Sequence, residues 1–277
     1  IMQKKTFVAN AVLLTAFSLL ARTIGMSFRV YLAGKIGAEG IGLFQLISTI
    51  FFFTSTFAVS GISLAVTRLV TDELAKGNRN TVRAVVVRCL FLSLGMSLLA
   101  AAVLLFGAPG FAAILKDERV TLPLRLLAPA LPFMAVSACF RGYFYAVRKV
   151  LKTASEQLLE QVVEIGIFVL LAGWLVPKGI GWACCALVIG TTLAEVVSCG
   201  YSYWLYRLEV GRKRSRPRRI PGLFRKICSI CIPVTASSCL RSGLSMVENM
   251  LIPAGLKRNG ETYESSLQGY GMLTGMV

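Results

Sequence analysis

The sequence predicts an all-α, polytopic transmembrane helix bundle, and three observations support this fold class. Apolar residues make up 56% of the 277-residue chain. Only 16% of the residues are charged, whereas soluble domains need about 25% to cover a surface that faces water. Long apolar stretches alternate with short basic clusters along the chain. Lipid is therefore the solvent that this composition fits.

The elements follow from the apolar stretches in order. A membrane helix needs about 20 apolar residues. The first stretch lacks the cleavage site of a signal peptide, so we expect it to remain in the protein. We expect an eighth helix to begin near Leu267 and to be cut short, which predicts a truncated chain. The complete spans are expected at 7–33, 42–70, 84–107, 122–147, 156–176, 180–206 and 227–253.

The basic residues predict the orientation of these spans. The chain has 30 Lys and Arg against 13 Asp and Glu, which gives a net charge of +17. A soluble protein with this charge would suggest a nucleic-acid partner, but no nucleic-acid motif accompanies the basic clusters. Most basic residues fall in alternate connections between spans, as the positive-inside rule requires. We therefore expect a multi-pass protein of the bacterial cell membrane with a cytoplasmic N-terminus, and no nucleic-acid partner.

One change of composition divides the chain into domains. Residues 209–226 contain the run R-K-R-S-R-P-R-R and lack an apolar stretch. We interpret them as a basic cytoplasmic linker that binds anionic membrane lipids, each basic residue contributing about 1 kcal/mol. A topology signal without lipid binding is the alternative. The predicted domains are an N-terminal six-helix lobe at 1–208, the linker, and the start of a C-terminal lobe at 227–277.

Polar side chains form stripes inside the first two predicted helices. In the first helix, residues spaced by three or four share one face: Thr15, Ser18, Arg22, Gly25 and Arg29. A second stripe follows in the second helix: Gln45, Thr49, Thr56 and Ser60. Charge inside a membrane usually faces water or a partner, so we expect these stripes to line a cavity. For the hydroxyl groups, close helix packing is the alternative.

Acidic residues also enter the apolar spans. Glu156, Glu160 and Glu164 recur every four residues in the fifth span, and Glu195 lies midway along the sixth. Glu248 lies two helical turns after Arg241 in the seventh span. Two interpretations remain open. These carboxylates either neutralise arginines inside the bundle or bind a coupling ion, a proton or sodium.

Several chemistries lack support in the sequence. The chain has no histidine, and its eight cysteines include one C-x-x-C pair, Cys228 and Cys231. A structural zinc needs four ligands, so buried thiols are the better interpretation of these cysteines. We find no arrangement of a nucleophile and a base and no glycine-rich phosphate loop. We therefore expect no enzyme activity, no catalytic residues, no metal site and no cofactor.

An ordered set of motifs resembles a known family. The run A-R-T-I-G-M-S-F-R-V-Y-L-A-G-K-I-G-A-E-G-I-G-L-F at 21–44 is similar to the first-helix region of the stage V sporulation protein B group. This group belongs to the polysaccharide-transporter branch of the multidrug/oligosaccharidyl-lipid/polysaccharide (MOP, MATE-like) flippase superfamily. The resemblance continues through G-I-S-L-A-V-T-R-L-V, R-G-Y-F-Y-A, E-Q-L-L-E-Q-V-V-E and I-P-V-T-A-S-S, and it covers essentially the whole chain.

This resemblance implies a protein of about twice this length, with two six-helix lobes around a central cavity and alternating access. In lipid II flippases, arginines of the first helix engage the substrate pyrophosphate, and Arg22 and Arg29 match that pattern, although the second arginine sits one position differently there. We include Arg241 in the same candidate substrate-binding set. The acidic candidates for coupling or ion pairing are Glu160, Glu164, Glu195 and Glu248.

Three functions are compatible with these features. The first is a flippase for an undecaprenyl-pyrophosphate-linked glycan, a polysaccharide or a peptidoglycan precursor such as lipid II, in cell-wall or spore-cortex synthesis. The second is a cation-coupled multidrug or metabolite antiporter of the same superfamily. The third is an envelope-assembly scaffold that transports nothing. Charge inside the membrane favours transport over a scaffold.

Overall fold

The computed structural model describes residues 2–77, 79–115, 117–210, 222–258 and 263–275, and the described chain is helical apart from its short connections. This confirms the all-α prediction. Two 3-10 turns, η1 (Glu118–Val120) and η2 (Val176–Lys178), join longer helices. The α-helices are α1 (Met2–Ala75), α2 (Arg79–Leu115), α3 (Thr121–Leu127), α4 (Ala130–Ala146), α5 (Val150–Leu175), α6 (Ile180–Val210), α7 (Leu223–Arg258) and α8 (Tyr263–Gly275).

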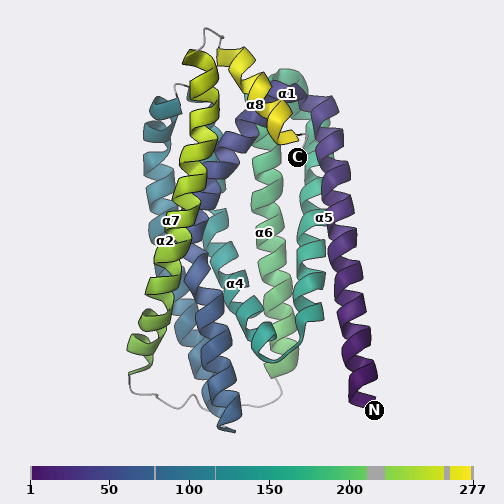
Figure 1. Ribbon diagram of the computed structural model, residues 1–277, viewed down its shortest axis with the longest axis vertical. Helices are drawn as coiled ribbons and strands as arrows, with labels where there is room; N and C mark the ends of the chain where they lie inside the picture. The colour runs from purple at the N-terminus through teal and green to yellow at the C-terminus, as the bar shows by residue number, and fades with distance from the viewer. Residues whose placement is uncertain (1, 78, 116, 211–221, 259–262, 276–277) are drawn as a thin grey trace.

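Helix α1 contains the first two predicted spans. It breaks at Gly37, where φ is 71° and ψ is 175°, a conformation that is essentially restricted to glycine. Figure 1 shows the purple N-terminal half rising along α5, crossing the upper end, and returning beside α7. The two halves are thus separate passes in opposite directions, and the glycine makes the reversal possible.

The predicted span 122–147 is not one straight helix. Residues 118–127 and 130–146 form two helical segments that meet at an angle of 42°. The break falls beside Pro129, and Pro132 follows. Proline removes an amide donor and its ring clashes with the preceding turn, so the segment bends there. Five described helices are long and apolar enough to cross a membrane, and the bent pair makes a sixth.

The surface of the bundle is apolar on the helices that lie outermost. Phe91 and Phe106 of α2 are 73% and 79% exposed, and Leu170 and Trp174 of α5 are 78% and 81% exposed. Large apolar side chains gathered in this way are unusual on a protein surrounded by water. Buried residues of α1, α2, α4 and α6 form the core between these helices. The chain is a multi-pass membrane protein.

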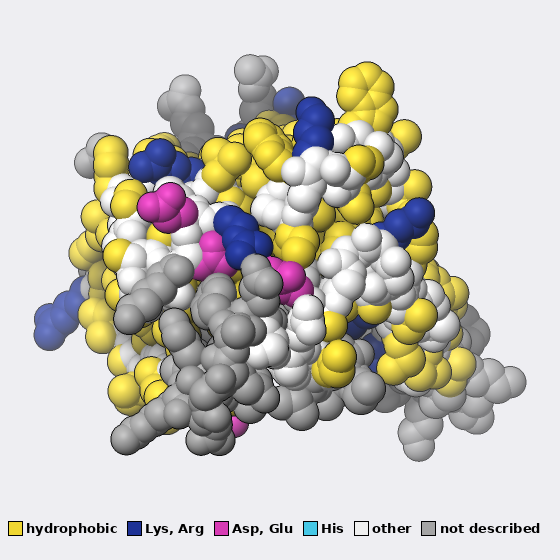
Figure 2. All heavy atoms as spheres, turned by 90° about the horizontal axis from the view of Figure 1, so that it is seen from above, with side chains coloured by type: hydrophobic (Ala, Val, Ile, Leu, Met, Phe, Trp, Pro, Cys, Tyr) yellow, Lys and Arg dark blue, Asp and Glu magenta, His cyan; other side chains and the backbone are white. Residues whose placement is uncertain are grey.

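Basic residues collect at one end of the bundle. The N-terminus, the α1–α2 turn, the α4–α5 turn, the end of α6 and the start of α7 all lie at the lower end in Figure 1. Figure 2 shows the opposite end, where acidic and basic side chains lie next to one another. The connections in which the sequence concentrates Lys and Arg therefore lie at the same end of the bundle.

The predicted domain boundaries stay a prediction. Most of the basic linker, residues 211–221, lies outside the described residues. Helix α7, assigned to the second lobe, packs directly on the returning half of α1. The Thr56 and Ser242 hydroxyl oxygens lie 3.0 Å apart, and the Cys231 thiol donates to the Gly61 carbonyl at 3.5 Å.

Glycines allow the closest helix contacts. A β-carbon at Gly142 of α4 would lie 2.6 Å from the Ser63 carbonyl oxygen of α1 and 3.0 Å from Val66. The Thr67 hydroxyl of α1 donates to the Gly142 carbonyl at 3.0 Å. Such contacts are how membrane helices approach without a hydrophobic driving force between them. Gly142 therefore fixes the spacing between α1 and α4.

We predict that Gly142→Ala lowers the melting temperature of the detergent-solubilised protein by roughly 5 °C, because the added carbon overlaps α1 backbone. Gly95→Ala is the matched control, since nothing lies within 4 Å of a β-carbon at Gly95. Alanine there should leave the melting temperature unchanged or raise it slightly. Equal losses in both variants would contradict the close approach at Gly142.

Candidate functional site

The acidic residues of α5 and α6 meet inside the bundle. Glu156, Glu160 and Glu164 recur at the spacing of one helical face, and that face is turned toward α4 and α6. Glu195 lies fifteen residues from each end of α6, at its midpoint. Glu156 and Glu195 are buried at 0% and 4% exposure, and Glu160 and Glu164 are half-buried. The four carboxyl groups thus form one cluster within the apolar core.

Arg141 of α4 supplies the positive charge of this cluster. Its guanidinium Nη1 lies 3.2 Å from Glu156 Oε1 and 4.0 Å from Glu160 Oε2. The Ser198 hydroxyl of α6 lies within hydrogen-bond distance of both carboxylates, at 3.2 Å from Glu156 Oε1 and 3.3 Å from Glu160 Oε2. One ion pair and one hydroxyl therefore tie α4, α5 and α6 together.

The remaining two carboxyl groups are held differently. Glu164 accepts a hydrogen bond of 2.7 Å from the Thr191 hydroxyl of α6. Glu195 lies within hydrogen-bond reach of Glu160. Among the described residues, Glu195 Oε2 and Glu156 Oε2 are buried without a hydrogen-bond partner. Leaving such atoms unpaired costs about 1–3 kcal/mol or more. Two oxygens of the cluster can therefore still accept a hydrogen bond or a proton.

A cavity of about 550 Å³ opens beside the cluster. One arginine faces three carboxyl groups in its lining, so its electrostatic character is acidic. Its lining residues come from α1, α4, α5 and α6: Ser63, Met134, Arg141, Tyr145, Gln157, Glu160, Gln161, Glu164 and Glu195. Acidic groups in a cavity inside a membrane bundle favour binding of a cation or a proton.

The first pass of α1 approaches this cavity at Gly25. A β-carbon at Gly25 would lie 2.7 Å from Gln161 Nε2, and Gln161 lines the cavity. Arg22 and Arg29, three residues before and four residues after Gly25, are exposed, and neither forms an ion pair with a described residue. Phe28 packs edge-on against Phe168 of α5. The first pass of α1 thus rests on α5 and leaves both guanidinium groups available.

The other residues of the predicted polar stripes fall into two groups, those that are exposed and those that contact another helix. Thr15 and Ser18 are exposed on the first pass of α1, and Gln45 is half-buried. Thr49 is buried near α8, where it lies within hydrogen-bond reach of Tyr270. Thr56 contacts Ser242 of α7. Part of the stripe therefore serves helix packing, which is the alternative considered for its hydroxyl groups.

The hydroxyl groups of Thr49 and Ser60 differ in their hydrogen bonding. The Thr49 hydroxyl donates to the Gln45 carbonyl at 2.8 Å within its own helix. The Ser60 hydroxyl is buried without a hydrogen-bond partner among the described residues. Ser60 lies in the same pass as Ser63, which lines the acidic cavity.

The two charged candidates of α7 lie apart from the acidic cluster. Arg241 and Glu248 are both exposed on α7, and neither lines the cavity of α4, α5 and α6. In the described chain they form no ion pair with one another. The structure therefore brings Glu160, Glu164 and Glu195 together and leaves Arg241 and Glu248 on a separate helix.

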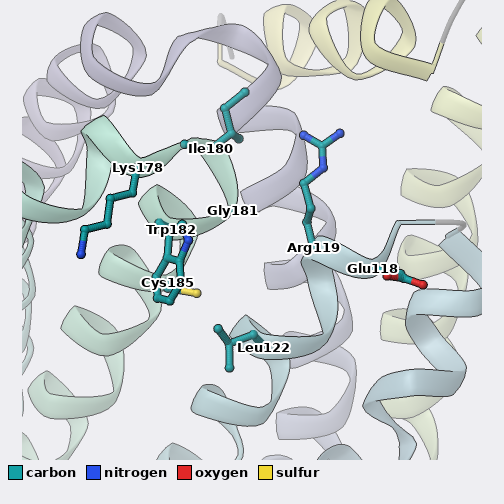
Figure 3. Close-up of a pocket in the computed structure, with 9 residues that line it drawn as sticks. Glu118, Arg119, Leu122, Lys178, Ile180, Gly181, Trp182 and Cys185 are labelled. Carbon is teal, nitrogen blue, oxygen red and sulfur yellow. The ribbon is translucent and has the colours of Figure 1, made fainter.

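A second cavity of about 580 Å³ lies at the upper end, between η1 and the start of α6. Figure 3 shows Arg119 and Glu118 pointing away from Trp182. Arg119 is neutralised by Glu39 at 3.1 Å and by Asp117 at 3.3 Å. Lys178 lies 6.0 Å from the Trp182 ring centroid. With its arginine already paired, this cavity is a poor match for an anion.

Sequence reasoning missed the part played by Arg141. The sequence does not single out Arg141, because it lies near the end of a predicted span and close to the basic residues Arg148 and Lys149. The useful signal was its register in α4. Arg141 precedes the end of that helix at Ala146 by five residues, or about 7.5 Å, which leaves it inside the bundle opposite Glu156.

We predict that Arg141→Gln destabilises the protein by about 3–5 kcal/mol, because Glu156 is left as a buried and unpaired charge. The double variant Arg141→Gln, Glu156→Gln should recover most of this loss. Lys76→Gln removes an exposed partner of Glu73 and should cost under about 0.5 kcal/mol. The single variant Glu156→Gln completes the cycle, and thermal melts of the wild type and the four variants measure the coupling. Additive losses in the double variant would disprove the buried pair.

The sequence and fold both have known counterparts. Stage V sporulation protein B of Bacillus subtilis (strain 168) is 28% identical over 282 aligned residues, which cover 100% of this chain and 54% of that protein. Lipid II flippase MurJ of the same organism is 28% identical over 208 residues, covering 69% and 38%. Sporulation protein YkvU is 20% identical, covering 98% and 60%. The chain spans about half the length of these relatives.

Solved structures share the fold at low sequence identity. A multidrug resistance MATE family transporter of the MOP superfamily, in an inward-facing conformation, matches with a TM-score of 0.60 at 14% identity, covering 91% of this chain and 56% of that one. MATE in complex with Br-NRF matches with a TM-score of 0.55 at 15% identity, covering 96% and 65%. Residues 7–258 match the family described as polysaccharide biosynthesis protein. The chain belongs to this polysaccharide biosynthesis family and has a MATE-like helical fold.

Proposed function

We propose that the chain forms the first lobe of a membrane transporter that flips an undecaprenyl-pyrophosphate-linked glycan by alternating access. A peptidoglycan precursor such as lipid II is the proposed cargo, in cell-wall or spore-cortex synthesis. The names of two relatives support this choice, since one is a sporulation protein and the other a lipid II flippase. Both are about twice as long as this chain, so we assign transport to the full-length protein.

The pair Arg22 and Arg29 carries this proposal. Arg22 lies fifteen residues before the break at Gly37, or about 22 Å along the helix, and Arg29 lies about 12 Å from it. Both are exposed and lie near one helical face of α1. A guanidinium held at this depth without an acidic partner is costly. A pyrophosphate group would supply the missing negative charge, and the arginine fork fits its oxygens with two parallel hydrogen bonds.

The same geometry suggests how the cargo crosses. The headgroup carries the charge and the sugar, so only it needs the polar path beside α1, while the polyprenyl tail stays in lipid. The arginines replace part of the water that the pyrophosphate loses, in a setting where charge interactions are stronger than in water. Helix α1 then acts as the binding element, and the two passes that meet at Gly37 place it beside α5 and α7.

The basic end of the bundle supports an orientation. Arg83 and Arg148 are exposed there, as are Lys149 and Arg207. By the positive-inside rule this end faces the cytoplasm, which places the N-terminus inside. The linker at 209–226 would then lie along the cytoplasmic leaflet and bind anionic lipids.

A cation-coupled antiporter of drugs or metabolites is the second candidate. The acidic cavity of about 550 Å³ favours it, because such a cavity attracts cations. The exposed arginines of α1 oppose it, since a path for organic cations should avoid fixed positive charge. Transport of a pyrophosphate-linked lipid and transport of an organic cation by the purified protein separate the two functions.

We predict that Arg22→Ala in the full-length protein abolishes flipping of a fluorescent pyrophosphate-linked lipid in proteoliposomes, because the phosphate loses its deepest cationic partner. Arg22→Lys keeps the charge but loses the fork and should retain a small part of the rate. Complementation of a strain depleted of its lipid II flippase gives a second measurement.

Arg125→Ala is the matched control, since Arg125 is exposed on α3, outside the α1 stripe and the acidic cavity. This variant should flip at the wild-type rate. All variants must reach the membrane in equal amounts, which is checked by quantitative blotting. Normal flipping by Arg22→Ala would exclude the phosphate role, whatever the result for Arg125.

A further inference from the structure

Two carboxyl groups face each other at the centre of the acidic cluster. Glu160 of α5 and Glu195 of α6 lie within hydrogen-bond reach across the helix interface, and both line the cavity. A carboxylate is an acceptor only, so a hydrogen bond between two carboxyl groups needs a proton on one of them. Two carboxyl groups placed in this way can form a hydrogen bond only when they share one proton.

We propose that Glu160 and Glu195 form a proton-binding site that exchanges one proton with water in the cavity. The site itself is independent of the cargo, but its use in driving transport rests on the function proposed above. Glu195 is the better proton acceptor of the two, since it is 4% exposed and its Oε2 has no hydrogen-bond partner among the described residues. An unsatisfied oxygen in the wall of a cavity is where a proton would bind.

The charges around the pair favour partial protonation. From α5, Glu156 and Glu164 add two carboxyl groups on the same face. From α4, Arg141 supplies a single positive charge, and Tyr145 also lines the cavity. From α6, the Cys199 thiol lies near Glu195, and from α1 the lining residue is Ser63, which does not titrate. Four carboxylates against one guanidinium would leave a large negative charge in the core.

The surrounding donors favour a proton over a metal ion. Arg141 and Ser198 already occupy oxygens of Glu156 and Glu160, and Thr191 occupies Glu164. Among the described side chains, no three Asp, Glu, His or Cys residues are arranged to hold a metal ion. The oxygens left at the pair are too few for the six or more ligands that hard cations prefer.

Release of the proton changes what Arg141 contacts. The shared proton passes to water, no other bond is made or broken, and both carboxylates remain ionised. Arg141 lies 3.2 Å from Glu156 and 4.0 Å from Glu160, so an ionised Glu160 competes with Glu156 for the guanidinium. The protonation state thus adjusts the contact between α4 and α5. Arg141 acts as a positioning residue, since it responds to the pair without holding the proton.

The test is infrared spectroscopy of the purified full-length protein, because protonated and ionised carboxyl groups absorb at different frequencies. We expect wild-type protein at neutral pH to show a protonated carboxyl band that loses the intensity of one group in Glu160→Gln and in Glu195→Gln. Glutamine has nearly the same shape, so both variants should keep the fold, as a melting curve verifies. Glu118→Gln, which changes an exposed carboxyl group, should leave the band unchanged.

Two outcomes would overturn the site. An unchanged band in both variants of the pair would show that the pair holds no proton. Equal loss in Glu164→Gln would place the proton elsewhere in the cluster. Replacing choline chloride with sodium chloride should leave the band intact, and its disappearance would assign the site to a metal cation instead.

A transport measurement separates this inference from the flippase proposal. A pH difference of one unit changes the ratio of protonated to ionised pairs by up to about tenfold. Flipping by the wild type should respond to an imposed gradient of this size, and Glu195→Gln should flip with less than about a twofold response. If the infrared band behaves as expected but no variant flips the lipid, the proton site stands and the cargo assignment fails.

Discussion

The ion pair between Arg141 and Glu156 is the interaction on which the rest of this lobe depends. It places two opposite charges inside an apolar bundle, where neither would be stable alone. Because the partners lie on α4 and α5, and Ser198 of α6 joins them, three helices must keep one relative register. The cavity is a consequence of that register, since its charged lining residues project from the same three helices.

Lipid as the solvent explains why polar contacts cluster so tightly. Every backbone group in a membrane helix is satisfied within the helix, so helices touch through small residues and a few polar side chains. Gly142 against α1 and Gly61 against α7 are contacts of the first kind. The hydroxyls of Thr56 and Ser198 are contacts of the second kind. The exposed phenylalanines of α2 and the exposed Trp174 of α5 cover the surface that lipid would meet.

Hydropathy was enough to predict most of the fold, because a span of about 20 apolar residues has few alternatives. It predicted two spans within the stretch that forms α1. The break at Gly37 divides α1 into two passes, which agrees with that prediction. Hydropathy treated 122–147 as one helix, although the prolines in the segment favoured the bend that α3 and α4 show. The sequence was enough to propose Glu160, Glu164 and Glu195 as acidic groups inside the bundle. It could not add Arg141 to that cluster, because contacts between separate helices depend on how each helix is rotated about its axis.

The first pass of α1, which carries Arg22 and Arg29, meets α5 at Gln161, one of the residues that line the acidic cavity. Arg22 and Arg29 flank the point where Gly25 meets Gln161, and Gln161 lines the acidic cavity. A pyrophosphate bound at the arginines, as proposed above, would add negative charge on the side of α1 that meets α5. Like charges at short range disfavour ionisation of the pair, so cargo on α1 would strengthen proton binding on α5 and α6. By linkage, a proton on the pair would strengthen cargo binding by the same factor.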